Sequence, residues 1–480
     1  MIRPKIAGCF ALLLAAASCN GSSPPPPPPP GTPPDLVNNP AADAGDETTQ
    51  SESHVVQSGN VVVVGFNDSG DFVAASSFTG YAYSIGGDPF VDAGVLAPVA
   101  GGANSGDPAL AVDGAGTIYF ATLAGDATGA SFIGVARSTA LAPAVTFGAP
   151  VLIPGLDPNG FQDKELIAVD ATGGANDGNV YVVWTEFFGN QSRILFSRST
   201  DAGVTYAPAA QISTMGLFVS GAVPAVGLNG EVYVAWQDRS AAVNSTIRFR
   251  SSNDGGVTWG AEGQAAALTR IRAAGPTGVC GRNALNGNIR VNEFPSLDID
   301  RSNGSNRGRI YITYSGDPDG NQNAGDAANV FVVSSVNGGA TWSPPVTVHQ
   351  APAATAGADA TTNDNFFPWV SVSGDGAVHV SFYDRRNDPA NLTIDTYRAV
   401  STDGGATWTN TRETPASFAV PVLSPNFDPL VARCYMGDYN GSFGQPTTAT
   451  LTWGDNSRNI TTPGFPGGRP DADVVRRQEP

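Results

Sequence analysis

A short signature recurs four times along the chain, and it constrains the fold more than any other feature of the sequence. Each copy contains Ser, then Asp or Asn two residues later, then Gly, Thr and an aromatic residue. The copies occupy residues 199–206, 252–259, 335–342 and 401–408. Recurrence of this kind predicts a repeat protein in which each copy belongs to one structural unit.

The residue types of the signature are those of a tight hairpin turn. The carboxylate or amide accepts backbone N–H groups, glycine tolerates positive φ, Thr favours the outgoing strand, and the ring packs between sheets. We therefore expect a structural rather than a catalytic role for the acidic or amide residue of each copy, namely Asp201, Asp254, Asn337 and Asp403.

The signature resembles the Asp-box, or BNR repeat, of sialidases and related β-propellers, and the resemblance implies an all-β propeller of four-stranded blades. The residues around each copy agree with this fold. Runs such as 179–184, 231–236 and 309–314 alternate with a period of two, as strands do. A second apolar run precedes each of them, and the strand that enters the signature follows, so each unit has the strand count of a propeller blade.

Six units are expected at 51–99, 105–153, 163–213, 222–270, 293–349 and 366–420, and an incomplete seventh at 435–477. The segment 35–42 could supply the missing outer strand of the last unit and close the ring, which would remove exposed sheet edges. The sequence therefore favours seven blades within a domain at 35–480, with six blades as the alternative.

Composition narrows the class of protein. With 58 Gly, 37 Pro and only 14% charged residues, the chain is unsuited to long solvated helices, and its 41% hydrophobic residues argue against disorder. The net charge of -18 has the wrong sign for binding nucleic acid or an anionic membrane surface. We expect neither of these partners.

The first residues resemble an export signal. Arg3 and Lys5 precede an apolar run at 7–17 that is too short to span a bilayer as a mature helix. The ending at 14–19 resembles a bacterial lipobox, which implies a signal peptide at 1–18 and lipidation of Cys19. An ordinary signal peptide with an incidental Cys is the alternative. The proline-rich segment 19–34 would then be a tether. With Asn20 rather than Asp after the Cys, the resemblance to sorted lipoproteins implies an outer-membrane or cell-surface location.

Two cysteines, Cys280 and Cys434, remain after Cys19 is assigned to the anchor, apart from Cys9 in the signal. An oxidising compartment permits a disulfide between them, and both lie in loop-like sequence. We expect this disulfide, with two buried free thiols as the alternative.

Functional residues are expected on the face opposite the signature turns, in the loops between second and third strands and in the loops that enter the innermost strands. These loops carry many charged residues. They form either a ligand site or a solvent-exposed surface on which the charges pair with one another. The candidates are Asp163, Asp238, Arg239, Arg290, Glu293, Asp384, Arg385, Asp438 and Tyr439.

A carbohydrate or glycoprotein is the expected ligand. Paired carboxylates serve glycoside hydrolysis, and the resemblance to sialidases implies a Tyr activated by a Glu, so the catalytic candidates are Asp163, Glu293 and Tyr439. Guanidinium groups bind a sugar carboxylate in bidentate fashion, which assigns ligand binding to Arg239, Arg290 and Arg385 with the neighbouring Asp238, Asp384 and Asp438.

The chain lacks the Phe/Tyr-Arg-Ile/Leu-Pro motif of catalytic sialidases, and its first unit opens with Ser51-Glu52-Ser53-His54 instead. Two functions from different classes therefore stay open. One is a glycoside hydrolase, such as an exo-α-sialidase, and the other is a non-catalytic propeller that binds glycan or protein.

A possible calcium loop occurs at Asp317, Asp319 and Asn321, where oxygen ligands alternate. It lacks the closing Glu of an EF-hand, and a solvated acidic turn is the alternative. No other cofactor is expected.

Overall fold

The computed structural model describes residues 34–39, 49–70, 72–271, 280, 283–320, 327–349, 363–420, 434–462 and 465–479, with the backbone alone from residue 458 onward. Residues 33–480 form one compact unit. The predicted signal peptide, Cys19 and the proline-rich tether up to residue 33 lie outside the described residues.

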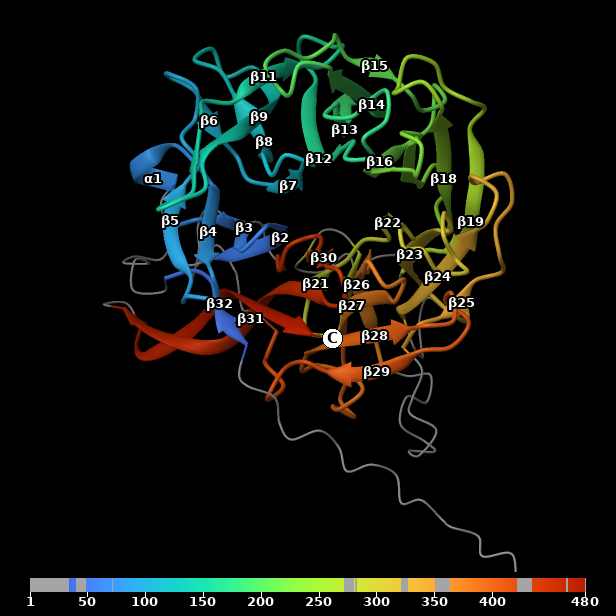
Figure 1. The fold of residues 1–480 in the computed structure, drawn as a ribbon. Helices are drawn as coiled ribbons and strands as arrows, with labels where there is room; N and C mark the ends of the chain where they lie inside the picture. Colours follow the sequence, from blue (N-terminus) through green and yellow to red (C-terminus); the bar gives the residue numbers. More distant parts are fainter. Residues whose placement is uncertain are drawn as a thin grey trace, which may run out of the picture. The chain divides into compact units, whose positions relative to one another are not determined.

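The described chain is almost entirely β-structure, in antiparallel sheets that succeed one another along the sequence (Figure 1). The first sheet contains β2 (Gln50–Ser58), β3 (Val61–Asp68), β4 (Thr79–Ile85) and β5 (Val91–Val95). The second contains β6 (Ala103–Asn104), β7 (Ala109–Val112), β8 (Ile118–Gly125), β9 (Ser131–Ala140), β10 (Thr146–Phe147) and β11 (Val151–Pro154). The third contains β12 (Phe161–Val169), β13 (Val180–Phe188), β14 (Gln191–Ser199) and β15 (Ala210–Gln211).

The next three sheets repeat this pattern. The fourth contains β16 (Val219–Val226), β17 (Val232–Asp238), β18 (Asn244–Ser252) and β19 (Gly263–Thr269). The fifth contains β22 (Ser296–Ile299), β23 (Ile310–Gly316), β24 (Asn329–Ser335) and β25 (Val346–Thr347), and the sixth contains β26 (Asn365–Val372), β27 (Val378–Asp384), β28 (Asp395–Ser401) and β29 (Thr409–Arg412). A small hairpin, β20 (Ala284–Leu285) and β21 (Ile289–Arg290), lies between the fourth and fifth sheets in sequence.

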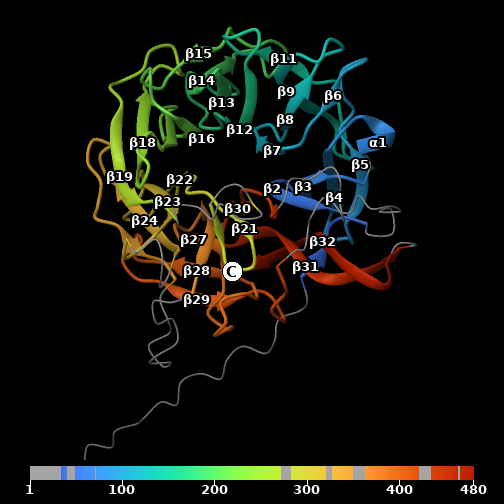
Figure 2. The same ribbon diagram turned by 180° about the vertical axis from the view of Figure 1, so that it is seen from behind.

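One further sheet combines strands from near both ends of the described chain. It contains β30 (Ser442–Gly444), β31 (Ala449–Thr462), β32 (Phe465–Glu479) and β1 (Asp35–Leu36), in the order β1-β32-β31-β30. Asp35 pairs with Arg476 and Leu36 with Val475, which confirms the prediction that this segment supplies an outer strand for the last unit. β30 contacts both β26 and β2, and Figure 2 shows β30 beside β2.

Within the described residues the protein is therefore an all-β propeller with six blades of consecutive strands, most of them four-stranded. This count corresponds to the alternative that the sequence left open rather than to the favoured seven. The difference lies in the sheet β1-β32-β31-β30, which is not built from consecutive strands. The four-residue helix α1 (Phe72–Ala75) is short, and no helix among the described residues has the length and apolar character needed to cross a membrane.

Apolar residues of the alternating runs fill the spaces between neighbouring sheets. Trp184 packs with side chains of the second and third sheets, and Trp236 with those of the third and fourth. Both indoles, like that of Trp453, are fully buried, as expected for core residues rather than sugar-stacking platforms. Burial of these large side chains is the main favourable term that holds the blades together.

The four signature segments form turns with one hydrogen-bond pattern. In the turn at 252–259, Asp254 accepts the backbone N–H of Thr258 at 2.8 Å and its hydroxyl at 2.6 Å, and Ser252 accepts the N–H of Gly256 at 2.8 Å. The hydrogen bonds that Asp254 accepts, that of the Thr258 hydroxyl first, lower its pKa to about 2. Asn337 accepts the equivalent N–H of Thr341 at 2.9 Å.

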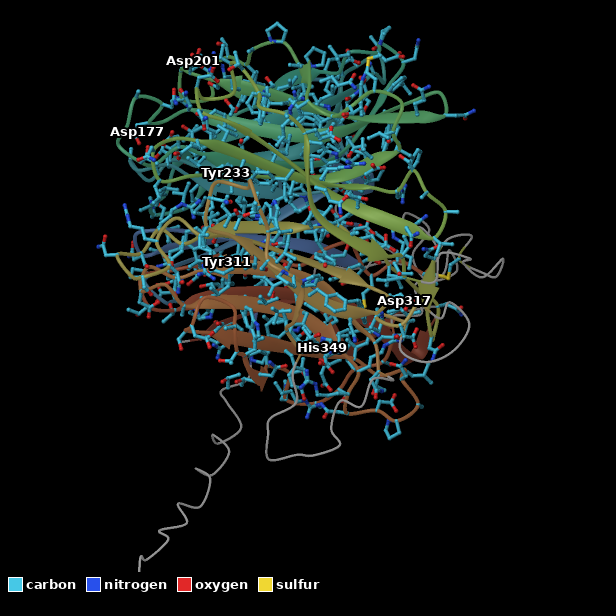
Figure 3. The ribbon with its side chains drawn as sticks, turned by 90° about the vertical axis from the view of Figure 1, so that its right-hand side faces the viewer. Asp177, Asp201, Tyr233, Tyr311, Asp317 and His349 are labelled. Atoms are coloured by element: carbon cyan, nitrogen blue, oxygen red, sulfur yellow. A yellow bond between two sulfur atoms is a disulfide. The ribbon has the colours of Figure 1, made fainter. Side chains whose placement is uncertain are left out.

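The turn glycine also contacts the preceding sheet. Gly256 has φ of +81°, and a Cβ atom there would collide with the ring of Phe196 on β14. Gly339 has φ of +86° and meets Phe249 on β18 in the same way. Two separate constraints therefore require glycine at each of these positions. One is the left-handed backbone conformation, and the other is the close approach of the aromatic ring. Figure 3 shows Asp201, in a signature turn, and Asp317, at the end of β23, on opposite sides of the molecule.

Candidate functional site

A cavity of about 380 Å³ lies among the loops that enter the innermost strands β12 and β22. Asp163 contributes from β12 and Glu293 from the segment just before β22. Arg239, which follows β17, and Arg270, which follows β19, line the same cavity, as does Asp438. The structure therefore brings together two of the three predicted catalytic residues, Asp163 and Glu293, with one predicted arginine, Arg239. Arg270 was not predicted.

Glu293 is held firmly within this cavity. Its carboxylate accepts the backbone N–H of Ile271 at 2.9 Å and the amide of Gln237 at 2.5 Å, and Arg270 Nε lies 3.8 Å away. Burial raises the pKa of Glu293 even though Arg270 and these hydrogen bonds oppose the shift. Burial also raises the pKa of Asp163, against the opposing effect of the adjacent lysine. Two carboxyl groups with raised pKa are suited to acid–base chemistry.

The predicted arginines have different environments. The Arg239 guanidinium lies over the ring of Phe218, with its carbon 4.7 Å from the ring centre. Arg290 forms a two-pronged ion pair with Asp438, at 3.1 Å from Nε and 2.8 Å from Nη2, and stacks on Tyr435. Arg290 thus holds Asp438, which in turn lines the cavity.

Three other candidates are engaged elsewhere and do not line the cavity. Arg385 is fully buried, pairs with Asp364 at 3.2 Å and donates to main-chain carbonyl groups. Asp384 pairs with Arg386, and Asp238 pairs with Arg248. These pairs match the other interpretation of the sequence, in which loop charges neutralise one another. Loop position alone cannot distinguish such a pair from a ligand contact.

Tyr439 lies beside the cavity rather than in it. Its hydroxyl donates to the carbonyl of Pro108 at 3.1 Å, and its ring packs near Trp369. Burial raises the pKa of Tyr439 well above its usual value, so the hydroxyl is held in its neutral form. It lines a second, smaller cavity of about 30 Å³, room for about one water molecule, which adjoins the first because both include Lys164 and Asp438.

The sequence did not identify a cluster of charges around Lys164. The Lys164 ammonium lies 3.0 Å from Glu52, 2.8 Å from Asp107 and 3.1 Å from Asp438. All four residues are less than a tenth exposed. We refer to these four residues, together with Arg290, as the Lys164 cluster.

The backbone explains why the cluster forms. Glu52, Asp107 and Lys164 have φ of 53°, 55° and 55°, at or just before the innermost strands of the first three sheets. Residues other than glycine seldom adopt this left-handed conformation. In β2 and β12 it coincides with a shift in strand register. No local pattern indicates such a bulge, so these residues could not be grouped from the sequence alone.

The Lys164 cluster perturbs its own members. Burial, together with the nearby Asp107, raises the pKa of Glu52 to about 8. Burial alone would raise the pKa of Asp438 as well, but Lys164 and Arg290 outweigh it, so this carboxyl stays ionised. Asn67 extends the network, because its side-chain amide donates to Glu52 at 3.2 Å and to the hydroxyl of Tyr435 at 2.8 Å.

The predicted disulfide between Cys280 and Cys434 is present, with Cα atoms 5.6 Å apart, and the prediction is confirmed. The backbone N–H of Arg290 also donates to the carbonyl of Cys434 at 2.9 Å. The disulfide and this hydrogen bond connect the segment that leads to Glu293 with the segment that carries Asp438. They therefore fix two walls of the cavity relative to each other.

The described part of the possible calcium loop, Asp317 to Gly320, forms a capped turn. Asp317 accepts the backbone N–H groups of Asp319 at 3.1 Å and Gly320 at 2.7 Å, as in a capped turn. Asn321 lies outside the described residues. Across the described ranges, no group of three or more His, Cys, Asp or Glu residues has the arrangement to hold a metal ion.

No family model and no curated protein matches the chain. Solved structures do match. A polysaccharide lyase, PL25 ulvan lyase, aligns with a TM-score of 0.52 and 11% identity over 93% of this chain and 95% of its own. A Hadza microbial sialidase aligns with a TM-score of 0.45 and 14% identity over 84% and 73%, and the intramolecular trans-sialidase of Ruminococcus gnavus with 0.40 and 10% over 94% and 98%.

The fold resembles, distantly, that of carbohydrate-active β-propellers. At these identities the likeness concerns the fold alone.

Proposed function

We propose that this protein binds a carbohydrate in the 380 Å³ cavity and cleaves it as a glycoside hydrolase. The observation that carries the proposal is the convergence of Asp163 and Glu293 with Arg239 and Arg270 in one hollow. A cavity of this size accommodates a small ligand such as a single sugar unit. The solved ulvan lyase that shares the fold is recorded bound to -[GlcA(1-4)Rha3S]-, which supports a saccharide ligand for a propeller of this kind.

The two carboxyl groups take different roles in this proposal. Burial raises the pKa of Asp163, which favours its acid form, and in this proposal Asp163 donates its proton to the glycosidic oxygen as the bond to the leaving group breaks. Glu293, fixed by the N–H of Ile271 and the amide of Gln237, acts on the opposite side as base toward water or as nucleophile. Arg239 and Arg270 orient an acidic or hydroxyl-rich sugar through their N–H groups.

An exo-α-sialidase is the narrower version of this function. It assigns the nucleophile to Tyr439 and the sugar carboxylate to arginines, with Arg290 positioning Asp438 at the cavity wall. In this version the Tyr439 hydroxyl has to leave the carbonyl of Pro108 before it can attack.

Hydrolysis of a panel of fluorogenic glycosides, sialosides included, by the purified exported chain tests the proposal, with calcium added and omitted. We expect turnover that falls at least about 100-fold in Asp163→Asn. The control is Glu231→Gln, a carboxyl group outside the cavity. Loss of sialoside cleavage in Tyr439→Phe would assign the sialidase version. A panel with no turnover would exclude hydrolysis of these substrates.

A second function, non-catalytic binding of glycan or protein, is favoured by one specific observation. The hydroxyl of Tyr439 and the guanidinium of Arg290 already have protein partners, Pro108 and Asp438. Binding on a glycan array, abolished in Arg239→Ala and unaccompanied by turnover, is the outcome expected for this function.

We also propose an exported, membrane-anchored state for the protein, with Cys19 lipidated and the signature turns belonging to the Asp-box family. The Cys280–Cys434 disulfide supports an oxidising compartment. Incorporation of labelled fatty acid into the chain, and its loss in Cys19→Ser, tests the anchor.

A further inference from the structure

The Lys164 cluster joins parts of the chain that are far apart in sequence. Glu52 lies on β2 of the first sheet, Asp107 just before β7 of the second, and Lys164 on β12 of the third. Asp438 belongs to the segment that leads into β30, and β30 contacts β2. The Lys164 ammonium therefore connects the first three sheets to the segment that leads into the sheet β1-β32-β31-β30.

The second contact across this junction is made by Asn67 on β3. Its amide donates both to Glu52 and to the hydroxyl of Tyr435, which lies in the segment before β30. Gly437 of the same segment approaches Glu52 closely, since a Cβ atom on it would lie 3.0 Å from the Glu52 backbone nitrogen. The seam between β2 and the segment 434–440 is therefore packed around Glu52.

The charges at this seam do not cancel when every carboxyl group is ionised. Lys164 and Arg290 supply two positive charges, against the carboxyl groups of Glu52, Asp107 and Asp438 in direct contact with them. A buried site that carries excess negative charge is costly, and a proton on one carboxyl group removes the excess. The other ionisable groups around this seam are Asp163, Glu165, Tyr435 and Tyr439, and burial raises the pKa of each of them.

We propose that the Lys164 cluster is a proton-dependent clasp, which holds β2 against the segment 434–440 while Glu52 carries a proton and loosens this seam when the proton is lost. The packing of the seam holds the Glu52 carboxyl group near Asp107 and Asp438, with Gly437 against its backbone, so a negative charge on Glu52 is repelled by both neighbours. The clasp is independent of any catalytic activity.

The pH range follows from the two environments of Glu52. In the closed seam its pKa is about 8, and in an open, hydrated seam it returns to the ordinary value of 4.5. Between these values the closed form binds more protons than the open form, so closure weakens as pH rises, and above about pH 8 the effect levels off. The equilibrium constant for opening should rise about tenfold for each pH unit in this range.

Hydrogen exchange of the intact protein, measured from pH 5.5 to 9 and corrected for intrinsic amide rates, tests the clasp. We expect exchange in β2 and in 434–444 to rise by about tenfold per pH unit up to pH 8, while β17 of the fourth sheet stays constant after correction. In Glu52→Gln, which keeps the shape of the protonated side chain, the rise should disappear.

A second variant keeps the test decisive if Glu52→Gln fails to fold. Asp107→Asn removes one of the negative neighbours that raise the pKa of Glu52, so the levelling-off should move to lower pH. Exchange at the seam that is independent of pH in the unmodified protein would overturn the proposal. So would a rise of equal size in β17, or a rise that persists unchanged in Glu52→Gln.

Discussion

Asp163 and Glu293 line the same cavity although a complete sheet, β16 to β19, separates them along the chain. The propeller produces this relationship because the segments entering the innermost strands β12 and β22 converge at one face. A pair of carboxyl groups from different sheets is thus positioned by the fold as a whole rather than by a local motif. Substitution of one of these carboxyl groups, with both turnover and stability measured, distinguishes a chemical role from a structural one.

Replacement of Glu293 by Gln should lower kcat on the best substrate of the glycoside panel by about 100-fold or more, because the carboxylate is lost while its shape is kept. The amide oxygen can still accept the N–H of Ile271, so thermal unfolding should change little. Steady-state kinetics and calorimetry measure the two effects. An unchanged kcat would remove Glu293 from the catalytic pair.

Asp403 should contribute to stability through its turn rather than through ligand binding. Asp403→Ala removes an acceptor for the N–H and hydroxyl groups of Thr407 and should cost about 1 kcal/mol. Asp403→Asn should cost less, because Asn337 already occupies the same position in another turn. Chemical denaturation compares the two variants, and a larger effect on ligand affinity than on unfolding would contradict the structural role.

The same aspartate predicts a dependence on acid pH. Hydrogen bonds from Thr407 lower the pKa of Asp403 to about 2 from an ordinary 3.8. Its stabilising contribution is therefore complete above pH 3.8 and is lost as the pH falls through 2. Unfolding of Asp403→Asn between pH 2 and 5 should lack this component, and identical pH profiles for the two proteins would refute it.

Gly256→Ala should destabilise the junction between the third and fourth sheets. The new methyl group meets the Phe196 ring, and the left-handed backbone is strained, so a loss of about 2–4 kcal/mol is expected. Gly189→Ala is the matched control, since Gly189 has φ of +55° and open space around it. It should cost only the backbone term of about 1–2 kcal/mol. Equal losses in urea denaturation would mean that the ring contact is unimportant.

Removal of the disulfide should loosen the cavity as well as the fold. Loss of a native disulfide typically costs about 2–5 kcal/mol, here for Cys280→Ser combined with Cys434→Ser. Because the bond connects the walls that carry Glu293 and Asp438, ligand affinity should fall together with stability. Titration with ligand before and after reduction measures this, and affinity that survives reduction would show that the walls are held by other contacts.

The parts of the fold that could be predicted from the sequence are the ones set by local patterns. The turn around Asp254 depends on residues within one short segment, and the strands around Trp184 and Trp236 depend on alternation. The pairing of Cys280 with Cys434 could be predicted because only these two cysteines remained once Cys9 and Cys19 had been assigned to the predicted signal and anchor.

The site was predicted only in part because its composition depends on which loops meet. Asp163 and Glu293 do line one cavity, whereas Arg385 was grouped with them on loop position and instead pairs with Asp364 in the interior. Glu52 was passed over because its role depends on a left-handed residue in β2 and on partners from three other segments. Conformation of this kind is imposed by tertiary packing and leaves no trace in residue spacing.

The outer strand β1 has a consequence for the order of assembly. Asp35 and Leu36 pair with β32, so during synthesis from the amino end nearly all of the chain has to be made before this sheet is complete. Until then β2 lacks the contacts that β30, β31 and β32 supply, and the pairing of Asp35 with Arg476 joins residues from near opposite ends of the described chain. Such contacts form slowly, and the unfinished chain presents an open edge meanwhile.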